Sequence, residues 1–268
     1  MKPERECRIK DKSIFMEGKA ETKIKSGIAT VTFFHPQSNS LPGELLRKLA
    51  DEITSAGKNP ETKVIVLKSE GEKAFCAGAS FDELLAIKTF EEGKKFFSGF
   101  AYVINAIRKV PQFVIARVQG KAVGGGVGLA SAADYTHAVG NASVKLSELA
   151  LGIGPFVVGP AVERKIGTAA FASLTINASD WHSAEWARQN GLYAQTFSSV
   201  EEMDKAIEKL VAQLSAGNPE AMRELKKNFW KGTEHWDELL IERAEISGRL
   251  VLSEYTRNAI ENFKSQKK

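Results

Sequence analysis

The chain has 268 residues, of which 43% are hydrophobic and 26% are charged. This balance suits a packed core in one large domain, or a domain with a small addition, and argues against global disorder. The net charge of +4 is too small and too dispersed to indicate a nucleic-acid-binding protein. No apolar stretch approaches the ~18 residues of a membrane helix, and residues 1–12 lack the apolar segment of a secretory signal. We therefore expect a cytoplasmic protein without a membrane partner.

The cysteines and histidines show no spacing that is typical of a metal site or a redox site. We therefore expect two reduced thiols and no bound metal. These residues are Cys7, Cys76, His35, His137, His182 and His235.

Short apolar runs alternate with helical patterns, which predicts an α/β protein with parallel strands. Residues 21–25 and 28–34 alternate with period two around Ser26-Gly27, as in a β-hairpin. Residues 64–67 are a continuous apolar run, which is typical of a strand buried on both faces, and 113–118 is expected as a second buried strand. A third such strand is expected at 135–139, and helices are expected at 41–56, from 81 onward, at 90–110 and at 127–133.

Beyond Pro160 the pattern is almost entirely helical, with one short strand at 193–197 and Ser183 as a candidate N-cap. Helices are expected at 161–166, 168–175, 183–190, 200–214, 219–230, 237–252 and 253–263. We divide the chain into a polar N-terminal extension, an α/β core and a helical C-terminal region, with bounds 1–17, 18–200 and 201–268.

Two glycine-containing segments, 74–79 and 120–126, follow buried strands and precede helical patterns. Backbone N–H groups at such positions lie at helix N-termini, where they are free to donate and are favoured by the helix dipole. Two such amides that meet at one point would stabilise the negative charge that develops on a carbonyl oxygen. The alternative is that the glycines only allow tight turns and close packing. The spacing fits neither a dinucleotide fingerprint nor a phosphate-binding P-loop.

Glu148 stands in an otherwise apolar run that continues through Pro155. A carboxyl group that is desolvated there would have a raised pKa, which suits proton transfer near neutral pH. The alternative is a surface or salt-bridged glutamate at a turn. Ser147 has no histidine at a telling position, so a Ser-His-Asp hydrolase is not expected.

Together these motifs resemble the enoyl-CoA hydratase/isomerase (crotonase) family over residues 19–268. The resemblance implies a crotonase-like spiral of repeated ββα units and a helical C-terminal region that packs around a homotrimer, often paired into a hexamer. The matching segments are Ala-Phe-Cys-Ala-Gly-Ala-Ser at 74–80, Val-Gln-Gly-Lys-Ala-Val-Gly-Gly-Gly at 118–126, Asp134, the run from Ser147-Glu148 through Gly152 to Pro155, and Ser183 to Leu192.

The resemblance also implies the chemistry. The backbone amides of Ala79 and Gly125 match the two oxyanion donors of the family, and Glu148 matches one of its two catalytic glutamates. The protein would then be an acyl-CoA-processing enzyme that stabilises a thioester enolate. Coenzyme A enters as part of the substrate, and no permanently bound cofactor is implied.

One departure from the family affects the expected reaction. The second glutamate of the hydratases would fall at Gly128, and a glycine cannot hold or deliver a proton. A reaction with a single base, such as double-bond isomerisation, is therefore easier to write than hydration. Phe156, Val157 and Val158 replace smaller residues and predict an apolar acyl pocket of altered shape. We expect Gly124 and Gly128 in the same lining, with Gly128 leaving a gap beside the acyl carbons.

Contacts with coenzyme A are implied at two places. The segment with Cys76, Ala77, Gly78 and Ser80 would border the adenine, although many members have Asp where this chain has Ser80. The C-terminal tail would contact the CoA phosphates of a neighbouring subunit through Phe263 and Lys264 or Lys267. The alternative for the lysines is simple solvation.

Two further hypotheses stay open. One is hydration of a short or branched enoyl-CoA, as in the methylglutaconyl-CoA hydratases. The other is a non-catalytic binder of acyl-CoA or of RNA, for which Lys226, Lys227 and Lys231 offer a modest basic cluster. Among the aromatic residues, His137 is expected to pack in its strand, and four tryptophans are expected in amphipathic helices as core or interface residues. They are Trp181, Trp186, Trp230 and Trp236.

Overall fold

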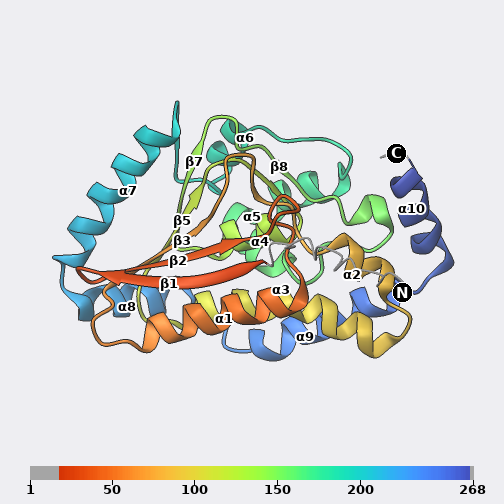
Figure 1. Cartoon of the computed structure of the whole chain (residues 1–268), viewed down its shortest axis with the longest axis horizontal. Coiled ribbons are helices and arrows are strands. Elements are labelled where there is room, and N and C mark those ends of the chain that lie inside the picture. The colour runs from red at the N-terminus through yellow and green to blue at the C-terminus, as the bar shows by residue number, and fades with distance from the viewer. Residues whose placement is uncertain (1–17, 266–268) are drawn as a thin grey trace, which may run out of the picture.

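The computed structural model describes residues 18–265 and contains two β-sheets. The larger sheet has six strands in the order β1-β2-β3-β5-β7-β9 (Figure 1). Its first two strands form the predicted antiparallel hairpin, and the others add in parallel. The strands are β1 (Lys19–Lys25), β2 (Ile28–Phe34), β3 (Val64–Ser69), β5 (Val114–Val118), β7 (Tyr135–Val139) and β9 (Gln195–Phe197).

The hairpin turn explains how the first two strands pair. Ser26 and Gly27 both have positive φ values, 52° and 79°, which is the backbone geometry of the tight turns that match strand twist. Ala29, Val31 and Phe33 alternate along β2 and are fully buried, so the hairpin is held to the core by one face.

The second sheet was not predicted. It contains three short parallel strands in the order β4-β6-β8, which are β4 (Ala74–Cys76), β6 (Lys121–Val123) and β8 (Val144–Lys145). Both glycine segments were expected as loops, but each contributes a strand here. Strands of two or three residues are too short for a period-two pattern to reveal them.

The paired strands and the helices after them form the repeated ββα units that the resemblance implied. The four units end in α1 (Gly43–Lys58), α2 (Phe81–Ala86), α4 (Gly125–Ala132) and α5 (Gly159–Ile176). Each unit gives its first strand to the large sheet and, after the hairpin, its second strand to the small sheet. The prediction of a crotonase-like spiral is therefore confirmed.

A layer of helices covers one side of the large sheet. Helices α1, α3 (Phe90–Lys109) and α9 (Trp236–Leu250) lie together beneath β1 and β2 (Figure 1). Helix α3 begins at a capping box between Thr89 and Glu92, where each side chain accepts from the other residue's backbone N–H. A Cβ at Gly93 would lie only 2.8 Å from the Cα of Gly248, so α3 and α9 approach closely at two glycines.

The C-terminal helices pack on the spiral. Helix α7 (Val200–Ser215) lies on β5, β7 and β9, and α10 (Glu254–Ser265) contacts the short 3-10 helix η1 (Leu149–Leu151). Ser183 caps α6 (Ala184–Gln189) as predicted, because its hydroxyl accepts from the N–H of Trp186 at 3.0 Å. The two helices expected at 161–166 and 168–175 are found within α5, where the backbone at Gly167 is not helical and separates them (φ 76°, ψ 160°). The division at residue 200 stays a prediction.

Lys226, in α8 (Pro219–Phe229), does not belong to a basic surface cluster. Its side chain is 3% exposed, and its ammonium pairs with the Asp134 carboxylate at 2.9 Å. It also donates to the backbone oxygens of Ile107 and Gln112. The prediction of a basic surface cluster for RNA binding is therefore wrong, because Lys226 is buried and its charge is paired inside the protein.

The aromatic predictions are confirmed in part. Trp230 and Trp236 are buried and meet edge to face with their ring centroids 5.7 Å apart. His137 is buried and packs edge-on against Tyr135 and Phe197. Trp181 is an exception, because it precedes α6 in an irregular segment and its side chain is 45% exposed. None of the helices in the described part of the chain has the length and apolarity to cross a membrane.

Candidate active site

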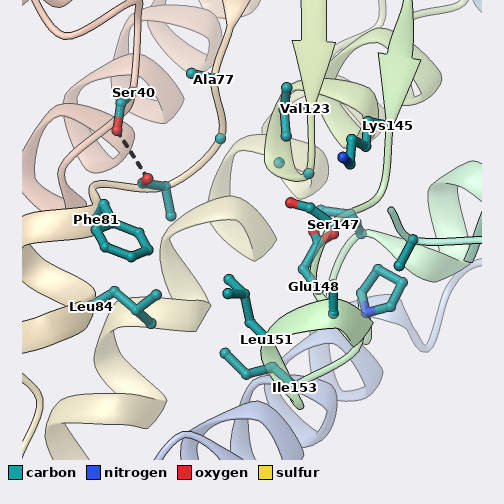
Figure 2. A pocket seen from close by; sticks show the side chains of 18 of the residues that line it. Ser40, Ala77, Phe81, Leu84, Val123, Lys145, Ser147, Glu148, Leu151 and Ile153 are labelled. Carbon is teal, nitrogen blue, oxygen red and sulfur yellow. Dashed lines mark hydrogen bonds between the residues drawn. The ribbon is translucent and has the colours of Figure 1, made fainter. Parts of the chain in front are cut away.

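A pocket of about 1030 Å³ lies where α2, α3 and the small sheet meet η1. Its lining has two chemically different sides, which Figure 2 shows. Leu84, Leu151 and Ile153 gather on one side, while Lys145 and Ser147 lie on the other. The apolar side can desolvate a hydrocarbon chain, and the polar side can contact a charged or hydrogen-bonding group.

The Ala79 amide is one of two backbone donors at the pocket. The Gly78 carbonyl accepts from Leu41 N–H at 2.8 Å, and Ser80 N–H donates to the Leu41 carbonyl at 3.1 Å. The Ala79 carbonyl accepts from the Ser40 hydroxyl at 2.9 Å (Figure 2). The surrounding backbone is thus fixed, while Ala79 N–H has no hydrogen-bond partner among the described residues.

The Gly125 amide is the second donor, at the first position of α4. Gly124 precedes it with a φ of 53°, and its N–H donates to the Lys145 carbonyl at 2.9 Å. The Gly124 carbonyl accepts from the N–H groups of Val127 and Gly128, which starts the helix. Gly125 N–H has no partner within residues 18–265 and carries the partial positive charge of a helix N-terminus.

The two donor segments are in contact with each other. A Cβ at Gly78, whose φ is 89°, would lie 3.6 Å from the Gly125 nitrogen and 3.1 Å from the Val123 carbonyl oxygen. A Cβ at Gly125 would overlap the ring of Phe100. Glycine is therefore required at both positions for the small sheet and α4 to close around the pocket.

Glu148 lies between β8 and η1, with its side chain in the pocket lining (Figure 2). A Cβ on Gly124 would lie 2.9 Å from the Glu148 Oε1 atom, so this carboxyl group sits against the start of α4. The Oε2 atom is buried and has no hydrogen-bond partner among the described residues. Burial raises the pKa of Glu148 to about 7, with a smaller lowering by its own backbone N–H. The group can therefore both take and return a proton near neutral pH.

The raised pKa of Glu148 predicts a loss of stability as pH rises. The pKa is 4.5 ordinarily and about 7 in the fold, so the folded chain binds more protons than the unfolded chain between these values. The free energy of unfolding then falls as pH rises through this window, and the stabilisation is fully present only below it. Glu148→Gln removes this dependence, so the variant should gain about 2–3 kcal/mol relative to wild type between pH 4.5 and pH 8.

Urea unfolding at several pH values checks this expectation. Glu208→Gln on α7 removes an exposed carboxylate and controls for the loss of a charge. Identical pH slopes in wild type and Glu148→Gln would contradict a carboxyl group that is destabilised by burial.

Gly128 does not leave a gap, and this prediction is wrong. It is fully buried in α4 and is absent from the pocket lining. A Cβ at this position would lie 2.5 Å from Cγ1 of Val158 and 2.7 Å from its Cβ. Val158 thus occupies the space beside position 128, and the protein has neither a carboxyl group nor room for one at this position.

The other predicted residues lie at or near the pocket. Gly124, Phe156 and Val157 contribute to the lining, as do Ala77 and Gly78. The roles proposed for these residues stay predictions.

Two residues of the predicted CoA segment, Cys76 and Ser80, are absent from the pocket lining. The Cys76 side chain is fully buried, and its pKa is raised to about 12 by burial. The Ser80 hydroxyl is occupied as the N-cap of α2, where it accepts from Glu83 N–H. Any contact of these two residues with CoA would be made by their backbone. Phe263 lies in α10, and Lys267 and Cys7 lie outside the described residues.

Several lining residues were missed by the sequence analysis. Phe96, Phe97 and Phe100 belong to the helix predicted at 90–110, but they were not predicted to form a wall of the pocket. Lys145 and Trp181 were not recognised as lining residues either, because their positions depend on the unpredicted strand β8 and on the segment before α6. No histidine of the described chain lines the pocket, and no group of three metal-ligating side chains occurs within it.

Solved structures define the class of protein. The enoyl-CoA hydratase of Bacillus halodurans superposes with a TM-score of 0.84 over 91% of this chain and 99% of its own, at 21% identity. An enoyl-CoA hydratase of Mycobacterium avium gives 0.81 over 92% and 96%, at 25% identity. This fold, with a pocket lined by the starts of two helices, is that of the crotonase-type α/β enzymes.

Sequence comparison gives the family. The enoyl-CoA hydratase/isomerase family model matches residues 23–263, and the chain belongs to this family of enzymes. YngF of Bacillus subtilis (strain 168), assigned as an enoyl-CoA hydratase/isomerase, is 35% identical over 77% of this chain and 79% of its own. Carnitinyl-CoA dehydratase of Salmonella enteritidis is 32% identical over 75% and 76%. Rat mitochondrial methylglutaconyl-CoA hydratase is 32% identical over 73% of this chain, which spans 63% of the rat protein.

Proposed function

We propose that this enzyme shifts the carbon–carbon double bond of an enoyl-CoA through a thioester enolate. The Ala79 and Gly125 amides donate to the enolate oxygen, and Glu148 is the single acid/base. The observation that carries the proposal is the Glu148 carboxyl group, buried without a partner in the pocket that these two amides also line. A buried carboxyl group without a partner costs free energy, and a catalytic use accounts for its retention.

The reaction balances with this one side chain. The Glu148 carboxylate takes a proton from Cα of a 3-enoyl-CoA, and the electron pair moves into the thioester carbonyl to form a conjugated enolate. The two amides stabilise the oxygen, where donors of this type contribute several kcal/mol in other enzymes. The protonated Glu148 then returns the same proton to C4, the double bond forms between C2 and C3, and the carbonyl is restored. No water is consumed.

The hydratase hypothesis is the second candidate, favoured by the methylglutaconyl-CoA hydratase relatives. Hydration normally uses one carboxyl group for water and another for the α-proton. Val158 stands against Gly128, where the family's second glutamate would be. The apolar side of the pocket also offers no cation to a carboxylate on the acyl group, since Asp82, Lys145 and Glu148 are the titratable residues of the described lining. Isomerisation therefore agrees better with the pocket.

A substrate screen separates these functions. The protein is mixed with 3-hexenoyl-CoA and, separately, with 2-hexenoyl-CoA, while the absorbance of the conjugated thioester is followed. Isomerisation raises the absorbance with the first ester, and hydration lowers it with the second. We expect the rise with 3-hexenoyl-CoA and little change with 2-hexenoyl-CoA. A fast loss of absorbance with 2-hexenoyl-CoA would favour the hydratase, and silence with both esters would favour a non-catalytic acyl-CoA binder.

We also propose a homotrimer, or a hexamer of two trimers, in the cytoplasm. Large apolar side chains that are exposed in the single chain support an assembly. Ile176 at the end of α5 is 75% exposed, and Tyr255 at the start of α10 is 71% exposed. Sedimentation velocity of the purified protein tests the assembly, and a monomer at micromolar concentration would contradict it.

A further inference from the structure

Two lysines and a tryptophan form a cluster at the polar side of the pocket. The Lys121 ammonium lies 4.7 Å from the ring centroid of Trp181, and the Lys145 ammonium lies 5.6 Å from the same centroid. Lys145 and Trp181 both line the pocket, and Lys121 is exposed beside it at the start of β6. We call Lys121, Lys145 and Trp181 the cationic cluster.

The small sheet places both lysines on one face. Val123 pairs with Lys145 in the parallel register of β6 and β8, and Lys121 lies two residues before Val123. Side chains two apart on a strand point the same way, so Lys121, Val123 and Lys145 share a face of the sheet. Figure 2 shows Val123 and Lys145 directed from neighbouring strands toward the pocket. His182, which pairs with Val144, fixes the adjacent Trp181 against this face.

The two positive charges are not neutralised by a carboxylate. Neither lysine forms an ion pair among the described residues, and Lys145 donates instead to the Ser179 carbonyl at 2.6 Å. The nearby Asp180 carboxylate accepts from the Asn177 amide at 2.9 Å. The indole ring offsets part of the repulsion between the ammonium groups by cation–π attraction. An anion at this position would remove that repulsion and gain two charge-assisted contacts.

The two-sided pocket indicates which anion this is. The apolar side, with Leu84, Leu151 and Ile153, is the side that can desolvate the acyl chain of an acyl-CoA whose carbonyl accepts from Ala79 and Gly125. The rest of the thioester must leave on the polar side, and the charged groups of CoA are its phosphates. We infer that the cationic cluster binds the phosphate groups of the CoA moiety. The inference rests on the proposed function only in taking an acyl-CoA thioester as the ligand.

This subsite is separate from the CoA contacts implied by resemblance. Those contacts involve residues 76–80 and the C-terminal tail. The cationic cluster lies instead on β6, on β8 and on the segment that precedes α6. The cationic cluster would therefore raise affinity for CoA thioesters of any acyl chain, while leaving the choice of acyl chain to the apolar side.

Binding measurements on charge variants test the subsite. Lys145→Gln and Lys121→Gln are made in a Glu148→Gln background, so that no turnover interferes with calorimetry. Butyryl-CoA, glutaryl-CoA and butyryl-pantetheine, which lacks all phosphates, are the three ligands. We expect each lysine variant to weaken both CoA esters about five-fold and the double variant to weaken them more, with butyryl-pantetheine unchanged. Lys209→Gln on α7 removes an exposed lysine far from the pocket and should change nothing.

Two results would overturn the inference. One is an equal loss of affinity for butyryl-pantetheine, which would mean a general disturbance of the pocket. The other is a loss confined to glutaryl-CoA, which would assign the anion to the acyl group. Lys121 is exposed at the start of β6, so its variant keeps the test valid if Lys145→Gln disturbs the contact with Ser179. The binding measurement does not depend on turnover. The inference about the phosphate subsite can therefore fail while the proposed isomerase activity holds, and the reverse.

Discussion

Glu148→Gln is expected to lower kcat/KM for enoyl-CoA isomerisation by about 10³-fold, within the range that one acid/base group contributes. Glutamine fits the same space but cannot take or return a proton. The amides of Ala79 and Gly125 are unchanged, so the Kd for a saturated acyl-CoA should change less than about three-fold. Stopped-flow absorbance with 3-hexenoyl-CoA gives the rate, and calorimetry with butyryl-CoA gives the affinity.

The pH dependence of the wild-type enzyme provides a second measurement of the same group. Proton removal needs the carboxylate form, and the pKa of Glu148 is raised to about 7. The wild-type kcat/KM should therefore rise with pH up to this value and level off above it, and the residual activity of Glu148→Gln should lack this rise. Near-wild-type rates in the variant would refute the assignment of Glu148 as the acid/base.

Gly128→Glu, which restores the second glutamate of the hydratases, is expected to destabilise the fold by about 3–5 kcal/mol. Its Cβ would lie 2.5 Å from Cγ1 of Val158, and the carboxylate would be buried without a partner. Helix α4 has no free side to accept the side chain, because all eight of its residues are buried. Urea unfolding measures the loss, and Gly140→Glu is the control, since an added Cβ there meets only the Phe197 carbonyl oxygen at 3.5 Å.

A compensating change at Val158 separates crowding from burial of charge. The pair Gly128→Glu with Val158→Gly removes the overlapping side chain and should recover about 1–3 kcal/mol of the loss. If space and a second carboxyl group are what hydration lacks here, the double variant should also begin to add water to 2-hexenoyl-CoA. Full stability of Gly128→Glu alone would show that Val158 does not occupy that space.

Much of the architecture could be predicted from local patterns. The hairpin around Ser26-Gly27 follows from period-two alternation and a turn that requires positive φ. The apolar run at 64–67 predicts a buried parallel strand because it has no polar face. The apolar neighbours of Glu148 left open a desolvated carboxyl group or a surface glutamate, and the burial that raises its pKa agrees with the first.

The sequence by itself, therefore, determined the type of most long elements and set Glu148 in an apolar run. Only the tertiary structure decided what fills the space beside Gly128, because Val158 reaches it from a segment thirty residues further along the chain. The same holds for Lys226. The sequence suggests an exposed lysine, but the folded chain buries its ammonium beside the Asp134 carboxylate. It holds also for Lys121, Lys145 and Trp181, which three short segments bring to one side of the pocket. Local patterns record the period and burial of single elements, whereas contacts between distant segments depend on how those elements pack together.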